Sequence, residues 1–247
     1  MTATMNTGAE TIRLDCKYMP LLLQLKTTGA VGVDDTTTRA LARLEAGELL
    51  RDGQLHPMAD AILAIVAEPA LVISVERMRL GAIAASTIWA TPDGATIGTR
   101  VEGGLYELKL AATALLPFHL FQLIHLRPLP AGSSVDVTLG AETMLSAESM
   151  LARSDRGGAV TVLVDAGLGD DGAESAVQLL ESRVASWRIH SLWSAEGGSQ
   201  SYEAHGMDCG VRGHVLVTVG AEQPTLRLRS ASFAEVTTAV RGGLPSS

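Results

Sequence analysis

One order of features occurs twice in this sequence, at Glu107 to Pro128 and again at Thr225 to Pro245. Each stretch begins with alternating apolar and polar residues, continues through small residues into an apolar segment with helical spacing, and ends at a proline. At an offset of 118 positions, the difference between 226 and 108, Leu108 falls on Leu226. A strand and a helix that recur in this way indicate two related halves.

Further strands are predicted before each copy. Alternating β-branched segments separated by glycine- and proline-containing turns are typical of an antiparallel meander. In the first half these segments are Leu71–Met78, Ala82–Ala90, Thr96–Gly104 and Leu105–Leu110. In the second half they are Trp187–Ala195, Ser199–Met207, His214–Gly220 and Thr225–Arg229, with turns predicted at Gly197–Gly198 and Gln223–Pro224.

Helices are predicted on either side of these meanders. The first half has helical spacing near Pro20–Lys26 and in a segment that ends at Gly53, and Pro57 begins a further helix. In the second half, Ser232 and Glu235 have the spacing of a capping box. Each predicted sheet has one apolar face to cover, so two units can join edge to edge while helices pack beside them.

The expected fold is therefore α/β of the α+β kind. We expect one domain over residues 1–247, with related halves at about 11–130 and 131–247. The halves should each be a helix, antiparallel meander and helix, arranged with pseudo-twofold symmetry around a central, mostly antiparallel sheet with flanking helical bundles.

Composition narrows the range of partners. The formal net charge is −8 and aromatic residues make up 4% of the chain, which is unfavourable for binding nucleic acid. The N-terminus lacks a basic segment followed by an apolar one, and the longest uncharged run, Leu110–Leu126, is too short to span a membrane. Cys16 and Cys209 cannot form a disulfide framework. These features favour a cytoplasmic protein.

The segment Gly167–Gly172, GLGDDG, matches the G-x-G-x-x-G pattern of dinucleotide-binding sites. It follows the apolar run AVTVLV and precedes a predicted helix, which suggests an NAD(P)-binding enzyme as one hypothesis. However, Asp170 and Asp171 would place negative charge where a pyrophosphate must lie, and both are suited to capping the helix. The residues that follow predict an antiparallel meander rather than further parallel units.

Other catalytic or metal-binding patterns are not found in the sequence. The six histidines form no H-x-x-x-H or H-E-x-x-H pair, and Asp165, Asp170 and Asp171 do not have EF-hand spacing. No G-x-S-x-G elbow exposes a serine nucleophile. We therefore expect a protein without enzymatic activity, bound metal or cofactor.

The order of several short motifs resembles the EspG family of type VII (ESX) secretion-associated proteins of actinobacteria. The motifs are the helix start DG-x-L-x-P at Asp52–Pro57, the link PAGSSV at Pro130–Val135, and a Leu-Pro pair after the closing helix of each half. The resemblance runs from about Thr11 to Pro245. It implies two pseudo-twofold related halves with a central, largely antiparallel sheet.

The same resemblance implies a function. EspG proteins are cytosolic chaperones that bind a PE–PPE heterodimer, cover the hydrophobic tip of the PPE protein and help to deliver it to the secretion system. The family resemblance thus implies a PE–PPE-type partner, and leaves open a divergent protein that serves another secreted substrate. It does not decide between a monomer and a homodimer.

The family contacts its partner through the loop between the second and third strands and through helices of the second half. By position, that loop is about Arg77–Gly81 here, which is shorter than is usual in the family. We predict Arg77, Met78, Arg79 and Leu80 as partner-binding residues, because they combine an adaptable apolar surface with flanking charge. An ordinary hairpin turn is the alternative interpretation.

Overall fold

The computed structural model describes residues 3–6, 10–32, 34–101, 104–130, 134–220 and 224–245. Gly103 of the predicted strand Thr96–Gly104, the predicted turn residue Gln223 and the centre of the PAGSSV link lie outside them. The chain forms two compact units. Unit 1 comprises Met1–Val75, Ala84–Leu120 and Ser191–Ser201, and unit 2 comprises Glu76–Ile83, Phe121–His190 and Tyr202–Ser247.

In its described residues, the first half of the chain contains two short leading strands, three α-helices, a small two-stranded hairpin between the second and third of them, four long strands and a closing helix. Its strands are β1 (Ala3–Asn6), β2 (Thr11–Asp15), β3 (Leu50–Arg51), β4 (Gln54–Leu55), β5 (Leu71–Arg79), β6 (Ala82–Ala90), β7 (Ala95–Arg100) and β8 (Leu105–Ala111). Its helices are η1 (Cys16–Tyr18), α1 (Met19–Thr28), α2 (Asp35–Ala46), α3 (Pro57–Ala67), η3 (Thr113–Leu115) and α4 (Leu116–Leu123). Pro57 is the first residue of α3, as predicted.

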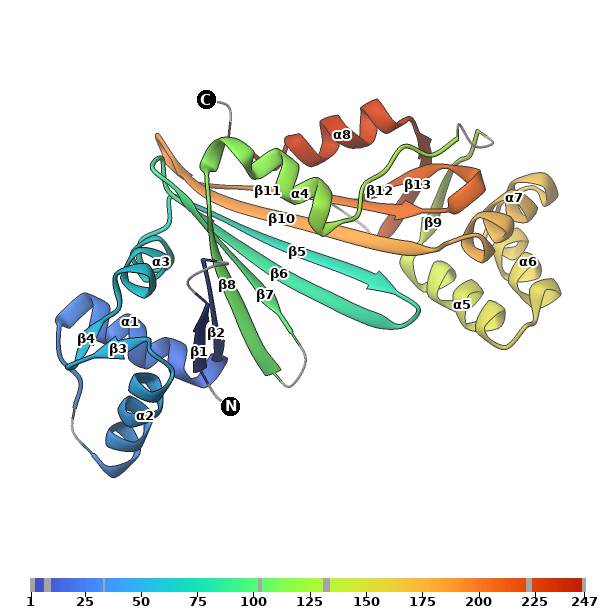
Figure 1. Cartoon of the computed structure of the whole chain (residues 1–247). Helices are drawn as coiled ribbons and strands as arrows, with labels where there is room; N and C mark the ends of the chain where they lie inside the picture. Colours follow the sequence, from blue (N-terminus) through green and yellow to red (C-terminus); the bar gives the residue numbers. More distant parts are fainter. Residues whose placement is uncertain are drawn as a thin grey trace. The chain divides into compact units, whose positions relative to one another are not determined.

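The second half repeats this order. Its strands are β9 (Asp136–Gly140), β10 (Ala185–Ala195), β11 (Gly198–Asp208), β12 (His214–Val219) and β13 (Thr225–Ala231). Its helices are α5 (Ala141–Ala152), α6 (Arg156–Asp165), α7 (Asp170–Glu181), η4 (Gly210–Arg212) and α8 (Phe233–Arg241). The helices α5, α6 and α7 of unit 2 pack on one another (Figure 1).

The large sheet has eleven strands in the order β1-β2-β8-β7-β6-β5-β10-β11-β12-β13-β9, and β3 and β4 form a separate two-stranded sheet. The leading strand of each half pairs antiparallel with the last long strand of the same half, β2 with β8 and β9 with β13. The hairpins β7–β8 and β12–β13 are also antiparallel. The predicted α+β fold with a mostly antiparallel sheet is confirmed.

The register between the two closing segments differs from the predicted one. Strand β8 begins at residue 105 and β13 at residue 225, an offset of 120 rather than 118. At this offset Leu108 corresponds to Leu228, and both side chains are 0% exposed. Leu120 corresponds to Val240 in the closing helices, and both are again fully buried. The predicted match of Leu108 with Leu226 is therefore wrong by two residues, which is one period of side-chain alternation in a strand.

Each unit has its own apolar core. In unit 1 the core joins β2, α1, α3 and β8 through residues that include Ile12, Leu14, Leu22, Ile62, Leu63 and Leu108. In unit 2 it joins the three helices to β9, β12 and β13 through residues that include Leu139, Leu163, Val177, Leu180, Val215 and Leu228. These side chains alternate along strands and recur every three or four residues along helices, as the sequence pattern requires.

The GLGDDG segment connects two helices, which corrects the dinucleotide-binding interpretation. The preceding apolar run is α6, not a strand, because Ala159 and Leu163 lie one helical turn apart and are both buried in the core of unit 2. Gly167 has a left-handed φ of 96° after the helix end. No strand precedes the motif, so no βαβ unit is present to hold a pyrophosphate.

The start of α7 also differs from the prediction. Asp170 and Asp171 do not cap this helix; its N-cap is Gly169, and the two carboxylates lie in the first turn. There they stabilise the helix through its dipole rather than through a capping hydrogen bond.

Two elements of the first half were not predicted. Gly53 was expected to end a helix, but α2 ends at Ala46 and Gly53 instead belongs to the β3–β4 hairpin. Asp52 and Gly53 have φ values of 53° and 75°, the left-handed pair that a two-residue hairpin turn needs. The edge strand β1 was also missed. None of the described helices is both long and apolar enough to cross a membrane.

Candidate functional site

The predicted binding loop is a tight hairpin. Strand β5 continues to Arg79 and β6 begins at Ala82, so only Leu80 and Gly81 form the turn. Their φ values are 50° and 76°, a conformation that glycine adopts freely and that leucine rarely adopts. The Leu80 side chain is 92% exposed. The structure therefore narrows the predicted loop to a two-residue tip, here called the β5–β6 tip.

The predicted binding residues lie on both faces of strand β5. Successive side chains of a strand point to opposite faces, so Arg77 and Arg79 share one face and Met78 lies on the other. Met78 is 40% exposed and lines a cavity in unit 2, whereas the other three predicted residues do not line it. Of the four predicted residues, only Met78 lines this cavity, and the binding role of all four stays a prediction.

This cavity, here called the methionine cavity, has a volume of about 270 Å³. Its apolar lining includes Met78 from β5, Met144 from α5, Met207 from β11 and Trp187 from β10. Methionine side chains are flexible and polarisable, so a wall of three of them adapts to apolar groups of different shape. The arrangement is suited to holding an apolar side chain of a protein partner.

The wall of the methionine cavity is rigid where Trp187 lies. Its indole is 5% exposed and lies over Gly206 of β11, and a Cβ atom at Gly206 would overlap the ring. Glycine at this position therefore allows the indole to lie flat on the neighbouring strand. One wall is fixed by this contact, and the methionines form the adjustable part.

Charged groups surround the apolar lining. Glu148 of α5 forms an ion pair with Arg183, and both line the cavity. Arg188 and His205 both contact the carboxylate of Glu203, at 2.6 and 3.0 Å. Burial raises the pKa of Glu203, but the hydrogen bonds from His205 and Arg188 outweigh this effect and leave the pKa below its ordinary value. The rim is thus polar and internally paired.

The opposite face of β5 carries unbalanced positive charge. The Nε atom of Arg77 is buried and has no hydrogen-bond partner within the described residues. Burial lowers the pKa of Arg77, and the charges of Arg79 and Arg127 act in the same direction, while Asp208 opposes them. Asp208 also contacts Arg127, with 3.4 Å between the Nη2 and Oδ2 atoms. One carboxylate therefore faces three guanidinium groups.

His125 belongs to the same region. Burial lowers its pKa, and the charges of Arg77 and Arg79 lower it further. It has a left-handed φ of 55° just after α4. Both effects favour the neutral imidazole over a further positive charge beside the arginines.

The described residues offer no arrangement for metal binding, since no group of three or more histidine, cysteine or acidic side chains converges among them. Cys209 is buried, and burial raises the pKa of its thiol to about 11, so this thiol is a core residue rather than a nucleophile. Cys16 is exposed and is not part of either core.

Comparison with known proteins places these features in a known fold. No family model and no curated protein matches the sequence. A solved structure does match over 95% of both chains, with a TM-score of 0.61 and 14% sequence identity. It is the Mycobacterium tuberculosis type VII secretion system chaperone EspG5 in complex with a PE25–PPE41 dimer.

The chain has the EspG fold. The resemblance inferred from short motifs is thereby confirmed at the level of the fold. Few residues are identical, but the order of the short motifs follows the order of helices and strands, and that order is shared over 95% of both chains.

Sequence analysis did not identify Met144, Trp187 or Met207. These residues are far apart along the chain, and each has an ordinary core position in its own helix or strand. The useful signal was the family's second contact region, the helices of the second half, since Met144 lies on α5. The structure brings this helix and the end of β5 to one cavity.

Proposed function

We propose that this protein is a cytoplasmic chaperone of a type VII (ESX) secretion system that binds a helical PE–PPE-type heterodimer. The observation that carries the proposal is the methionine cavity, where Met78 of β5 and Met144 of α5 line the same space. They belong to two regions that the resemblance to the EspG family implies as partner contacts. The EspG fold supports the same conclusion, because EspG5 has been solved with a PE–PPE dimer.

The proposed mechanism is burial of an apolar surface rather than bond chemistry. An exposed apolar tip of the PPE-type partner would insert a side chain among Met78, Met144 and Met207, and the exposed Leu80 would add contact area beside it. Removing such a surface from water is favourable by about 25 cal/mol per Å². Covered in this way, the partner stays soluble until it is handed to the secretion machinery.

Selectivity would come from the charged groups. Glu148 and Arg183 neutralise each other in an ion pair. An apolar partner can therefore cover them without leaving a buried charge unpaired. Arg77 and Arg79, on the other face of β5, form no ion pair within the described residues, and they favour an acidic residue where the partner passes around the β5–β6 tip. The partner expected here is therefore an apolar helical tip with acidic flanks.

The proposal is tested by copurification. The chain is co-expressed with the PE–PPE pairs of its own genome, and complexes are isolated by a tag on the chain. We expect one pair to copurify with the chain and to lose its tendency to aggregate. A partner outside the PE–PPE class, or no partner at all, would contradict the proposal.

A pair of variants locates the surface. Met78→Glu places a charge in the methionine cavity and is expected to weaken binding by about 2 kcal/mol or more, the range of an interface hot spot. Leu115→Glu is the matched control, because Leu115 is also an exposed apolar residue, at 52%, but lies in unit 1. Equal binding by both variants would show that the partner does not use the cavity.

A further inference from the structure

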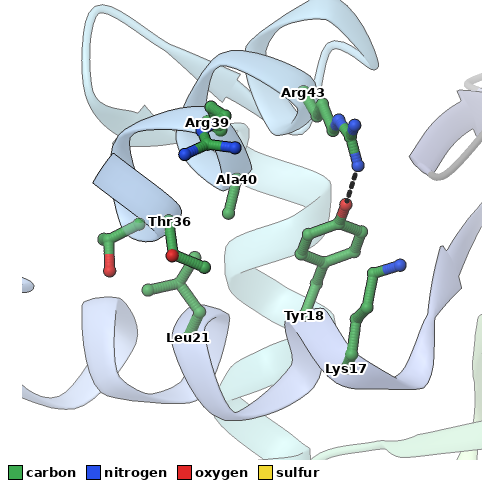
Figure 2. A pocket seen from close by; sticks show the side chains of 8 residues that line it. Lys17, Tyr18, Leu21, Thr36, Arg39, Ala40 and Arg43 are labelled. Atoms are coloured by element: carbon green, nitrogen blue, oxygen red, sulfur yellow. Dashed lines mark hydrogen bonds between the residues drawn. The ribbon is translucent and has the colours of Figure 1, made fainter. Parts of the chain in front are cut away.

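Unit 1 contains a second cavity, which the proposed chaperone role does not use. Its volume is about 380 Å³, and it lies between η1, α1 and the first turns of α2. The lining includes Lys17, Tyr18, Leu21, Thr36, Arg39 and Arg43 (Figure 2). This volume is within the range of small-molecule sites in proteins.

Positive charge dominates the lining. Three of the lining side chains are cationic and none is a carboxylate. The concentration is unusual in a chain whose formal net charge is −8. A cavity of this kind attracts anions, because its apolar walls focus the field of the charges that line it.

Helix α2 holds two of these cations on one face. Arg39 and Arg43 are four residues apart, so their side chains are neighbours on the helix surface, where like charges destabilise a helix. Neither forms an ion pair with an acidic side chain of the described residues. Both arginines are exposed, so their charges are accessible to a ligand that supplies negative charge.

The remaining contacts hold the cations in place without neutralising them. The Nη1 atom of Arg43 donates a hydrogen bond of 3.2 Å to the Tyr18 hydroxyl, as Figure 2 shows. Arg39 donates through Nε to the backbone carbonyl of Asp35 at 3.1 Å, and its two terminal nitrogens take no part in that hydrogen bond. Lys17 is the exception, since it forms an ion pair with Asp15 at 2.7 Å. Two guanidinium charges thus remain uncompensated.

The nearby carboxylates do not fill this role. Asp34 is the N-cap of α2 and accepts a hydrogen bond of 2.7 Å from the backbone N–H of Thr37. Asp35 lies in the first turn, and neither carboxylate lines the cavity. Leu21 and Ala40 provide an apolar part of the wall, which gives the cavity one charged side and one apolar side.

We infer that this cavity binds a small phosphorylated molecule, with a doubly charged phosphate between Arg39 and Arg43 and an apolar portion against Leu21 and Ala40. Two uncompensated guanidinium groups balance the two charges of a phosphate, and guanidinium matches phosphate geometry through paired hydrogen bonds. A singly charged carboxylate would leave one of the arginines without a counter-charge.

The inference is tested by isothermal titration calorimetry of the full chain at about pH 8, where a phosphate monoester is doubly charged. The probes are inorganic phosphate, phenyl phosphate and benzoate, at matched ionic strength. We expect saturable binding of phenyl phosphate, weaker binding of inorganic phosphate because it lacks the apolar part, and no saturable binding of benzoate. Binding of benzoate as tight as that of phenyl phosphate, or no binding of any probe, would overturn the inference.

Variants connect the binding to the cavity. Arg39→Gln and Arg43→Gln are each expected to weaken phenyl phosphate binding by at least about tenfold, the effect of losing one charged hydrogen bond. Arg100→Gln is the control, because Arg100 is an exposed arginine of β7 in the same unit and does not line the cavity. The hydrogen bond of Arg39 goes to the backbone of its own helix, whereas Arg43 also donates to Tyr18. Arg39→Gln therefore tests binding even if Arg43→Gln alters the position of Tyr18. Unchanged binding in both cavity variants would refute the site, and it would leave the chaperone proposal untouched.

Discussion

The two closing segments of the chain, β8 with α4 and β13 with α8, solve the same packing problem with different polar chemistry. Their buried residues correspond one to one, with Leu108 matching Leu228 and Leu120 matching Val240. Their helix starts do not correspond. Helix α8 has a full capping box between Ser232 and Glu235. The closing helix α4 of the first half is instead preceded by the 3₁₀ turn η3, and Ala112 before that turn supplies no side-chain cap.

This difference separates what the fold requires from what it tolerates. Apolar side chains at matching positions are required, because a strand and its closing helix must cover one sheet face. Orphan N–H groups at a helix start are satisfied in several ways, including side-chain caps, water and a tight first turn. We propose on this basis that the two halves arose by duplication and that their capping groups diverged afterwards.

The largest effect should come from the matched core leucines. Leu228→Ala and Leu108→Ala each remove a fully buried side chain, so each is expected to lower the free energy of unfolding by about 2 to 5 kcal/mol. Urea denaturation followed by circular dichroism measures both. A large loss at one position with little change at the other would break the correspondence between the halves.

An intermediate effect should come from exchanging the capping chemistry. Ser232→Ala removes the N-cap of α8 and is expected to destabilise the protein by about 1 kcal/mol. Ala112→Ser offers a hydroxyl at the matching position, where the backbone φ and ψ of −76° and 134° suit an N-cap. It should therefore stabilise the chain by a few tenths of a kcal/mol to about 1 kcal/mol. Midpoints of urea unfolding compare the two, and a loss in both variants would mean that the helix starts are not equivalent.

The smallest effect should be a pH dependence that comes from the capping box of α8, which has no counterpart at the start of η3. The side-chain hydrogen bond from Arg229, followed by those from the backbone and hydroxyl of Ser232, lowers the pKa of Glu235 to about 2 from the model-compound value of 4.5. Because the folded pKa is the lower one, the resulting stability is present above pH 4.5 and is lost as the pH falls to about 2.

Glu235→Gln removes this dependence while keeping a hydrogen-bonding side chain. Between pH 5 and 2, the wild type is expected to lose more stability than the variant, as measured by thermal unfolding at each pH. Parallel curves for the two proteins would show that the Arg229 and Ser232 contacts do not form in solution.

Local signals in the sequence were sufficient for the elements that obey local rules. The capping box at Ser232 and Glu235 and the proline start of α3 are confirmed, since each depends on residues within one turn. The β-branched residues of the α6 segment predict a strand, but the segment is helical. Its packing against α5 and α7 outweighs this weak preference for a strand. The predicted offset of 118 was short by two residues. Strands β7 and β12 are offset by 119, the difference between 214 and 95, and the link from β12 to β13 is one residue longer than the link from β7 to β8, which gives 120.

The candidate site was less accessible to sequence reasoning. Met78 could be proposed because it lies near the β5–β6 tip, which is fixed by short-range turn chemistry. Met144 and Met207 reach the same cavity through the pairing and packing of elements more than 60 residues away, since 144 and 78 differ by 66. The residue pattern within a single helix or strand cannot show that these methionines meet.

The leucine at the β5–β6 tip has a consequence for how such proteins change over time. Leu80 occupies a left-handed position that asparagine or glycine would fill with less strain, and its side chain contributes little to any core because it is 92% exposed. Replacing it alters the apolar surface at the end of the hairpin and leaves the sheet unchanged. Under the proposed function, a substitution at Leu80 would therefore change the surface offered to the partner without changing the core of either unit.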